Sequence, residues 1–595
     1  MFHDIAFLDG DSLKVRGVSA DYLNFVIEDQ LLDTTMWGKM VEPFLTKEDS
    51  DGFWRGEFFG KEMRGASLAY RLTKNERLYE VLTEAVRSLL KAQEEDGRIS
   101  SYSRETEFNG WDMWCRKYVL TGLLHYYDIC KDESFKREIL AALKKHLDYV
   151  IGHIGPKEEG KKSITETSSW WGCVNSCTIL EPTLALYTIT KEERYLSFAK
   201  YIIGTGGSSD CSFIDLALEN ELLPYQYPVT KAYETMSFFE GLLAYYEITK
   251  EEKYLRAVTN FLEAVSKSDL TLIGCSGCTH ELFDHSSIRQ SEPSKEIMQE
   301  TCVAVTWMRI SARMYLLTGE KKYLDRIEES ALNDLYGSLN TKHETQHNLL
   351  SKIEVPAMTF DSYSPLFDKE RGQGTGGYLE FHSGGHCGCC VAIGACGVAL
   401  YPLTFAFQAK EGLILSSFFT GEIKGKDENG NPYTLSLRSD FPRGSSMLLQ
   451  LEASKGAKIS IFLKTMQNSS GFLLDNKEIP AKDGYIHFEM EGEEKKEISF
   501  EPLLSYHRLN GKIAFTHGPL TLAVDEAKSC RPILEKVTPI FPLSYRVLKP
   551  VGDEFVRLEI ALKDGSYLLL SDYQSAGKHW NQEKNKISVW LPEEE

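Results

Sequence analysis

The sequence of 595 residues lacks any stretch that approaches about 18 uninterrupted apolar residues, the length at which a segment becomes a candidate membrane span. It also lacks an excess of basic charge, because 67 Lys and Arg stand against 87 Asp and Glu, a net charge of −20. This balance argues against nucleic acid and anionic membrane surfaces as partners. The start, Met1 to Asp4, has neither the basic nor the apolar region of a signal peptide, so we expect a cytoplasmic protein.

The composition favours a large core and a neutral ligand. Hydrophobic residues make up 42% of the chain and aromatic residues 11%, which is ample for a buried interior. An acidic, aromatic-rich protein suits a small-molecule carbohydrate better than a polyanion. We therefore expect a carbohydrate partner, whereas the oligomeric state, a homo-oligomer included, stays open.

A short motif recurs through the first two-thirds of the chain. Each copy has a Tyr, two further residues, a Thr or Cys, and then Lys or Gly followed by Asn, Asp or Glu. The Thr or Cys of the five copies is residue 73, 130, 190, 249 and 318. Successive copies are therefore 57, 60, 59 and 69 residues apart. A new helical pattern follows each copy. Repeated turns between amphipathic helices indicate stacked helical hairpins.

The repeat count predicts the fold class, a multidomain α + β protein. Five copies and the helix after Cys390 make six, the number that closes an (α/α)6 barrel, which we place over residues 1–405; an open solenoid is the rival. After about Leu403 the pattern changes to period-two alternation between turn signals. We assign residues 406–595 to one or two β-sandwich modules, and expect no chemistry from them.

Aromatic and acidic residues gather before the first helix of each hairpin. Counting back about 16 residues from each turn reaches such segments, which places them at one common end of the barrel. Aromatic rings stack on the C–H faces of sugars, and carboxylates accept hydrogen bonds from hydroxyl groups. The alternative is that Trp and Tyr only pack between helices. The substrate-binding candidates are Glu57, Trp111, Asp112, Trp171, Tyr233 and Glu234.

Two short segments carry the metal-binding candidates. The chain has 13 cysteines, and seven lie between Cys275 and Cys396, a clustering that favours reduced thiols and metal over a disulfide framework. One segment reads His386-Cys-Gly-Cys-Cys and the other Glu300-Thr-Cys. Together they offer a four-ligand zinc set of Glu300, Cys302, Cys389 and Cys390.

The spacing within each segment restricts where this set can form. Residues i and i+2 share a face in an extended chain but not on a helix, so Glu300 and Cys302 converge only just before their helix begins. The other pair precedes a small-residue helix that we expect from Val391 to Tyr401. Thiols at helix N-termini have depressed pKa values.

Alternative zinc sites remain open. Three thiolates and one carboxylate fill a tetrahedron, which is typical of a structural zinc. A second alternative uses the pair Cys275 and Cys278 with two downstream cysteines, although both can equally be ordinary buried thiols. Spacing alone does not choose between these sets.

Taken together, the motifs resemble glycoside hydrolase family 127, the β-L-arabinofuranosidase-like group. The likeness runs through most of the chain, and its specific part is the Glu-Thr-Cys triplet combined with the vicinal cysteines. The matching segments are Trp54–Lys61, Lys231–Glu234, Glu300–Cys302, Tyr323–Asp325 with Glu328 and Asn333, Cys389–Cys390, Lys512–Leu520 and Ser588–Leu591.

The resemblance implies an (α/α)6 barrel followed by β-sandwiches, and retaining hydrolysis with a zinc-bound cysteine as nucleophile. Cys389 is the implied nucleophile, and it shares the zinc with Glu300, Cys302 and Cys390. The family's acid/base segment, Gly-Glu-Ala-Phe, matches His280–Phe283, so Glu281 is the implied acid/base. His386 is added to the substrate-binding candidates. A thiolate in place of the usual attacking carboxylate keeps the double displacement if the thioglycosyl intermediate can be broken again.

Departures from the family leave the sugar open. The cysteine pair is followed by Val391-Ala-Ile where the family commonly has Pro-Pro-Asn, and Lys117 and Pro228-Val stand near the positions of the family's pocket histidines. Another furanoside or a modified sugar is therefore compatible with the sequence. Two rival functions are a non-catalytic carbohydrate-binding or regulatory barrel with a structural zinc, and an epimerase or lyase that uses histidine or tyrosine bases.

Overall fold

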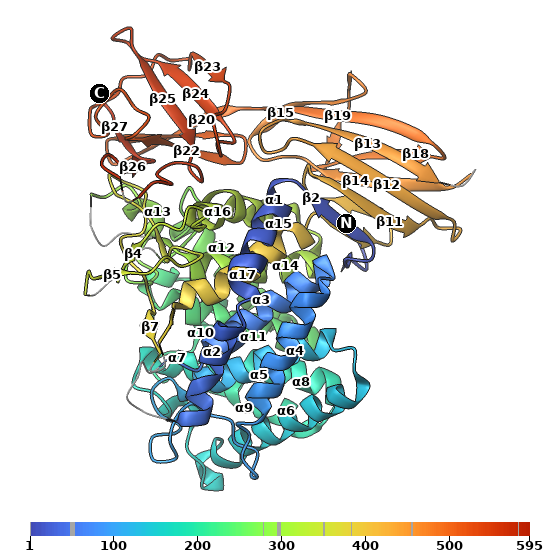
Figure 1. Ribbon diagram of the computed structural model, residues 1–595, viewed down its shortest axis with the longest axis vertical. Coiled ribbons are helices and arrows are strands. Elements are labelled where there is room, and N and C mark those ends of the chain that lie inside the picture. Colours follow the sequence, from blue (N-terminus) through green and yellow to red (C-terminus); the bar gives the residue numbers. More distant parts are fainter. Residues whose placement is uncertain are drawn as a thin grey trace.

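The computed structural model describes residues 2–47, 54–277, 279–293, 299–348, 351–381, 384–453, 456–580 and 582–594. Helices dominate up to α17 (Cys389–Leu403), and strands follow from β9 (Ala406–Ala409) onward (Figure 1). Among the helices described, none combines the length and the apolar character that a membrane crossing requires.

The five predicted hairpins are confirmed, each with the recurring motif at its turn. In four of them the residue after the motif's Thr, for example Lys74 or Gly319, ends the first helix in the left-handed conformation, and an extended residue then opens the second helix. The pairs are α3 (Phe58–Thr73) with α4 (Glu76–Leu90), α5 (Asp112–Ile129) with α6 (Glu133–His153), α8 (Leu180–Thr190) with α9 (Glu193–Gly204), α11 (Ala232–Thr249) with α12 (Glu252–Ser268), and α14 (Thr301–Thr318) with α15 (Lys321–Ser330).

The first helices of these pairs and α17 form a closed ring. Contacts run in order from α3 through α5, α8, α11 and α14 to α17, and α17 packs again on α3. This closure confirms the (α/α)6 barrel and excludes the open solenoid. The last helix begins at Cys389, two residues before the predicted start at Val391, with Gly388 as its N-cap. The vicinal cysteines therefore lie in the first turn of a helix.

Glycines on α3 allow its backbone to approach both neighbours. A Cβ atom on Gly60 would lie 1.9 Å from the carbonyl oxygen of Tyr118 in α5. A Cβ atom on Gly65 would lie 2.5 Å from the backbone nitrogen of Cys396 in α17. Because backbone atoms cannot move aside as a side chain can, glycine at these positions sets the spacing at which the ring closes.

Three large sheets follow the barrel. The strands of the first are, in order, β1 (Ala6–Phe7), β9, β10 (Gly412–Leu415), β14 (Lys458–Lys464), β18 (Tyr485–Glu491) and β17 (Ala481–Lys482). It contacts a second sheet, whose strands are, in order, β16 (Lys477–Glu478), β15 (Ser469–Leu474), β19 (Glu494–Pro502), β13 (Ser446–Ala453), β12 (Pro432–Ser439), β11 (Thr420–Lys426) and β2 (Leu13–Arg16). The strands of the third are, in order, β20 (Leu504–Leu509), β21 (Lys512–His517), β22 (Leu520–Asp525), β25 (Tyr567–Asp572), β24 (Arg557–Ala561) and β23 (Tyr545–Leu548). Two short strands join its side, β26 (Ile587–Ser588) on β22 and β27 (Leu591–Pro592) on β21. Side-chain burial alternates along β12 (Pro432–Ser439) and β18 (Tyr485–Glu491), as the period-two pattern predicts.

The N-terminal residues join the β region, a feature that the sequence pattern did not indicate. β1 (Ala6–Phe7) pairs with β9, and β2 (Leu13–Arg16) pairs with β11 (Thr420–Lys426). The chain therefore begins in the sheets and enters the barrel at α1 (Val18–Val26), which packs on α17. The division at residue 405 stays a prediction.

The ring closure can be tested with a pair of glycine substitutions. Gly65→Ala should destabilise the protein by about 1–3 kcal/mol, because the new methyl group overlaps the α17 backbone. Gly38→Ala is the matched control, since Gly38 lies in α2 (Thr34–Thr46) where a Cβ would meet no atom within 4 Å, and alanine there favours the helix by about 0.5–1 kcal/mol. Thermal unfolding midpoints measure both. An equal or higher midpoint for Gly65→Ala would contradict the close approach.

Candidate active site and metal centre

A cavity of about 250 Å³ opens at the end of the barrel where the ring helices begin. Glu57 precedes α3, Trp111 precedes α5, Lys231 precedes α11 and Glu300 precedes α14, so successive hairpins deliver their residues to one place, as predicted. The residues that line it are Trp54, Glu57, Lys61, Trp111, Trp114, Trp170, Trp171, Lys231, Tyr233, Glu234, Glu281, Glu300, Gly377 and Cys389.

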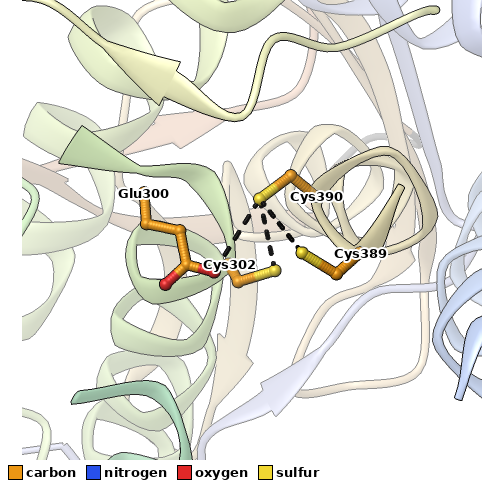
Figure 2. A group of neighbouring side chains, drawn as sticks. All are labelled: Glu300, Cys302, Cys389 and Cys390. Carbon is orange, nitrogen blue, oxygen red and sulfur yellow. Dashed lines mark hydrogen bonds between the residues drawn. The ribbon is translucent and has the colours of Figure 1, made fainter. Parts of the chain in front are cut away.

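Four donor side chains gather in the wall of this cavity (Figure 2). The ligand atoms of Glu300, Cys302, Cys389 and Cys390 all lie within 4.8 Å of one another, and all four residues are buried. The Cys390 Sγ atom is 3.4 Å from the Cys302 Sγ, 3.7 Å from the Cys389 Sγ and 3.9 Å from a Glu300 carboxylate oxygen. Two helix starts, those of α14 and α17, therefore meet at the cluster.

Local structure explains how residues two apart can share this cluster. Glu300 ends strand β3 (Gln299–Glu300), which pairs with β6 (Tyr363–Ser364), and is the extended N-cap of α14. Cys302 already lies in the first turn of that helix. Glu300 and Cys302 therefore converge at the start of α14, as predicted, with Glu300 just before the helix and Cys302 just inside it.

The electrostatics of the cluster favour one thiolate above the others. Hydrogen bonds from the thiols of Cys302 and Cys390, together with the nearby Lys61 and Lys231 ammonium groups, hold the pKa of Cys389 well below its usual range. Burial raises the pKa values of Cys302 and Cys390 well above theirs. The depressed pKa expected for thiols at helix N-termini therefore holds for Cys389 alone.

The arrangement fits a tetrahedral metal ion. Sulfur ligands placed about 2.3 Å from zinc at tetrahedral angles are about 3.8 Å apart, close to the separations observed here. The second carboxylate oxygen of Glu300 is buried and has no hydrogen-bond partner among the described residues. Burial is also the main cause that raises the pKa of Glu300 well above its usual range. A cation would relieve both costs.

The rival set based on Cys275 gains no support. The Cys275 Sγ contacts the carbonyl oxygens of Ser276 and Glu300, each at 3.4 Å, and Cys275 is not part of the metal-ligand group found among the described residues. Cys278 lies outside the described residues.

Glu281 projects into the cavity from a tight turn. His280 and Glu281, its two central residues, have φ angles of 50° and 64°, and the Leu282 N–H donates to the Thr279 carbonyl. The Ala232 N–H donates to the Glu281 carbonyl oxygen at 3.0 Å, which fastens the turn to the start of α11. Left-handed backbone at non-glycine residues costs free energy and persists only where the surroundings enforce it.

The Glu281 carboxylate is held at both oxygens. The Lys231 ammonium donates to one oxygen, and the Tyr363 hydroxyl donates to the other at 2.5 Å. Lys231 also lies 3.9 Å from a Glu234 oxygen. Burial opposes the charge on Lys231, but the carboxylates of Glu234 and Glu281 outweigh it and raise the pKa of this lysine. Aromatic rings line the same cavity, whereas the direct partners of the Glu281 carboxylate are an ammonium and a phenol.

A second buried ion pair, between Lys61 and Glu57, lies beside the cluster. The Lys61 Nζ donates to Glu57 at 3.0 Å and lies 3.9 Å from the Cys302 Sγ. The Trp114 indole N–H donates to the other Glu57 oxygen. Burial raises the pKa of Glu57 to about 7, although Lys61 opposes this shift.

The substrate-binding candidates divide into two groups. Glu57, Trp111, Trp171, Tyr233 and Glu234 all line the cavity. Asp112 and His386 do not, which corrects the grouping drawn from the sequence.

Both exceptions have a physical reason. The Asp112 carboxylate is fully buried and accepts hydrogen bonds from the Ser100 hydroxyl, the Phe108 N–H and the Arg116 guanidinium, so it fixes the loop before α5. His386 lies in the short hairpin β7 (Leu379–Glu380) and β8 (His386–Cys387) and stacks on Tyr378 with ring centres 6.0 Å apart.

Several residues of the site are not apparent from the sequence motifs alone. Lys61 follows Glu57 by one helical turn, a spacing that would have indicated the ion pair. Trp54, Trp114 and Trp170 lie within the aromatic segments that precede the ring helices, where nothing local distinguishes them from their neighbours. Tyr363 has no local signal, because it reaches the site only through the pairing of β6 with β3.

Comparison with known proteins places the chain among carbohydrate-active enzymes. The family model described as the β-L-arabinofuranosidase GH127 catalytic domain matches residues 17–349. A solved GH127 β-arabinofuranosidase has a TM-score of 0.73 at 16% identity over 100% of this chain and 98% of its own. A GH127 β-L-arabinofuranosidase from Geobacillus stearothermophilus T6 has a TM-score of 0.71 at 15% identity, with 98% and 100% coverage. No curated protein sequence matches the chain.

Metal binding is the first property of this site to test. Protein purified under reducing conditions should hold one equivalent of a divalent transition metal, measured by elemental analysis. Cys390→Ser should weaken metal affinity at least about 10-fold, because this thiol contacts every other member of the cluster. Cys530→Ser removes an exposed thiol that belongs neither to the ligand group nor to the cavity lining, so it should leave the metal content unchanged. Equal metal content in the two variants would refute the assigned ligand set.

Proposed function

The chain belongs to glycoside hydrolase family 127, and from this premise we propose that it is a retaining glycosidase that uses Cys389 as nucleophile and Glu281 as acid/base. The observation that carries the proposal is that this thiol and this carboxylate line the same small cavity. The proposed substrates are β-L-arabinofuranosides or closely related sugars at the ends of short oligosaccharides.

We assign the metal of this site as zinc. A set of three thiols and one carboxylate, all buried, has the donor chemistry that zinc prefers. Glu300, Cys302, Cys389 and Cys390 would hold it. When bound, zinc stabilises thiolate charge and lowers the basicity of the sulfur that later departs.

The first half of the reaction is a displacement at the anomeric carbon. The Cys389 thiolate attacks this carbon, a C–S bond forms, and the bond to the leaving-group oxygen breaks. Glu281 gives its proton to that oxygen, so the departing group leaves as a neutral alcohol. The lowered pKa of Cys389 supports its role, because the thiolate is the reactive form.

The second half reverses these roles. Water attacks the same carbon, Glu281 takes a proton from the water, and the C–S bond breaks to restore the Cys389 thiolate. Two displacements return the original configuration at the anomeric carbon. The Lys231 ammonium and the Tyr363 hydroxyl position the Glu281 side chain, and both donate to it as the carboxylate, the form that acts as base in this second step.

The remaining lining residues suit a saccharide. Trp111, Trp171 and Tyr233 offer ring faces, while Glu57 and Glu234 offer oxygen atoms to sugar hydroxyl groups. The volume of about 250 Å³ lies below the range of about 300–1,000 Å³ that is typical of sites for drug-sized ligands. The cavity therefore suits a single sugar unit, and the protein would remove residues from chain ends.

Two substitutions test the assigned roles. Cys389→Ser should lower turnover of an aryl glycoside by at least about 100-fold, because the serine hydroxyl is not ionised near neutral pH. Glu281→Gln should lower turnover of a disaccharide by a similar factor, because the leaving oxygen then lacks its acid. Steady-state kinetics on the sugar identified in a screen of furanosides and pyranosides measure both. Full activity in either variant would refute the role given to that residue.

Trapping experiments separate a nucleophile from a metal ligand. With an activated aryl glycoside, Glu281→Gln should accumulate a covalent glycosyl adduct on the peptide that contains Cys389, because the second step lacks its base. Mass spectrometry of the quenched protein detects it. Cys389→Ser loses a metal ligand as well as the nucleophile, so its metal content is measured in parallel. An adduct on another residue, or inversion of configuration in the first product, would contradict the mechanism.

A further inference from the structure

Trp170 stands out among the residues around the cavity because 47% of its surface is exposed, although it shares the cavity with Cys389 and Glu281. Trp114, deeper in the same site, is 1% exposed. An exposed indole forgoes the favourable free energy that burial of its apolar surface would give. Trp170 lies at the mouth of a cavity that suits one sugar unit. The rest of an oligosaccharide must therefore lie outside the cavity, beside Trp170.

The backbone that presents Trp170 is held in an unusual conformation. Trp171, Gly172 and Cys173 follow one another with φ angles of 51°, 57° and 62°. For the two residues with side chains this conformation is disfavoured. Only glycine fits in the middle, since a Cβ atom there would lie 2.3 Å from the Ser208 hydroxyl oxygen.

Neighbouring groups fix this segment in place. The Cys173 Sγ lies 3.0 Å from the Thr165 carbonyl oxygen and 2.7 Å from that of Ser168, and its single S–H is shared between these two acceptors. The Ser209 N–H donates to the Gly172 carbonyl at 2.8 Å. The Trp170 N–H donates to the Ser168 hydroxyl at 3.1 Å. The loop thus presents two adjacent indoles to one cavity in a single rigid arrangement.

The two indoles have different surroundings. The Trp171 ring lies 5.9 Å from the Lys231 ammonium, which itself holds Glu281, so it borders the reacting groups. Trp170 has no aromatic or cationic contact among the described residues and offers its ring to solvent. A flat, exposed and pre-positioned indole is suited to stack against the C–H face of a sugar ring.

We propose that Trp170 is the platform for the leaving group. Its indole ring stacks on the leaving sugar unit, the one next to the scissile bond. This contact makes the protein selective for saccharide over small-alcohol leaving groups. This inference rests on the proposed function, because a leaving group exists only if the site cleaves a glycoside. Trp170 is then a specificity-determining residue and takes no part in bond breaking.

The experiment compares two substrates of the same terminal sugar. Wild type, Trp170→Ala and Trp170→Phe are assayed on an L-arabinofuranosyl disaccharide and on methyl β-L-arabinofuranoside, or on the equivalent pair for whichever sugar the wild type cleaves best. The ratio of the two kcat/KM values should fall about 3- to 10-fold in Trp170→Ala, mainly through KM of the disaccharide, and Trp170→Phe should recover part of it. Tyr567→Ala, an exposed aromatic on β25 (Tyr567–Asp572), should leave the ratio unchanged.

A binding measurement keeps the two proposals distinguishable. Calorimetric titration of Glu281→Gln with the disaccharide and the free monosaccharide should show tighter disaccharide binding, and adding Trp170→Ala should remove that difference. If the wild type cleaves no glycoside yet this binding difference is found, the proposed function fails, and only the contact of Trp170 with the second sugar unit is upheld. If Trp170→Ala changes neither the kcat/KM ratio nor the binding difference, the platform is overturned whatever the activity.

Discussion

The site depends on the meeting of two helix starts that are 88 residues apart in the chain, at Cys302 in α14 and Cys390 in α17. Their sulfur atoms approach to 3.4 Å inside the barrel, next to a buried carboxylate that has an unpaired oxygen among the described residues. Such a group of donors is unfavourable in a low-dielectric interior unless a cation holds it together. A metal ion bound here would therefore join the fifth and sixth repeats as well as shape the site.

Ring closure makes that meeting possible. Glycines on α3 bring α17 close enough to complete the circle, and α17 carries Cys389 and Cys390 in its first turn. Every ring helix begins at the same end, so residues from all around the barrel reach one cavity. The repeat that stabilises the fold through hairpin packing is thus also what brings the cavity-lining residues together.

Local patterns predicted most of the fold and part of the site. The hairpins follow from a motif of a few residues, and the metal-ligand group follows from donor chemistry and spacing, so both were readable from the sequence. The contacts of Glu281 could not be predicted from the sequence. Its partners Lys231 and Tyr363 lie 50 and 82 residues away in the chain, and they reach it through a turn and a two-residue strand. Asp112 was assigned to the sugar from its aromatic neighbours, whereas its position in the first helical turn directs it to Arg116. The cytoplasmic location and the domain boundary stay predictions.

We propose that three thiolates and one carboxylate surround one zinc ion beside the cavity. X-ray absorption at the zinc edge of the purified, reduced protein tests it most directly. We expect about three sulfur scatterers near 2.3 Å and about one oxygen near 2.0–2.2 Å. A shell dominated by oxygen and nitrogen, or one with fewer than about three sulfurs, would contradict it.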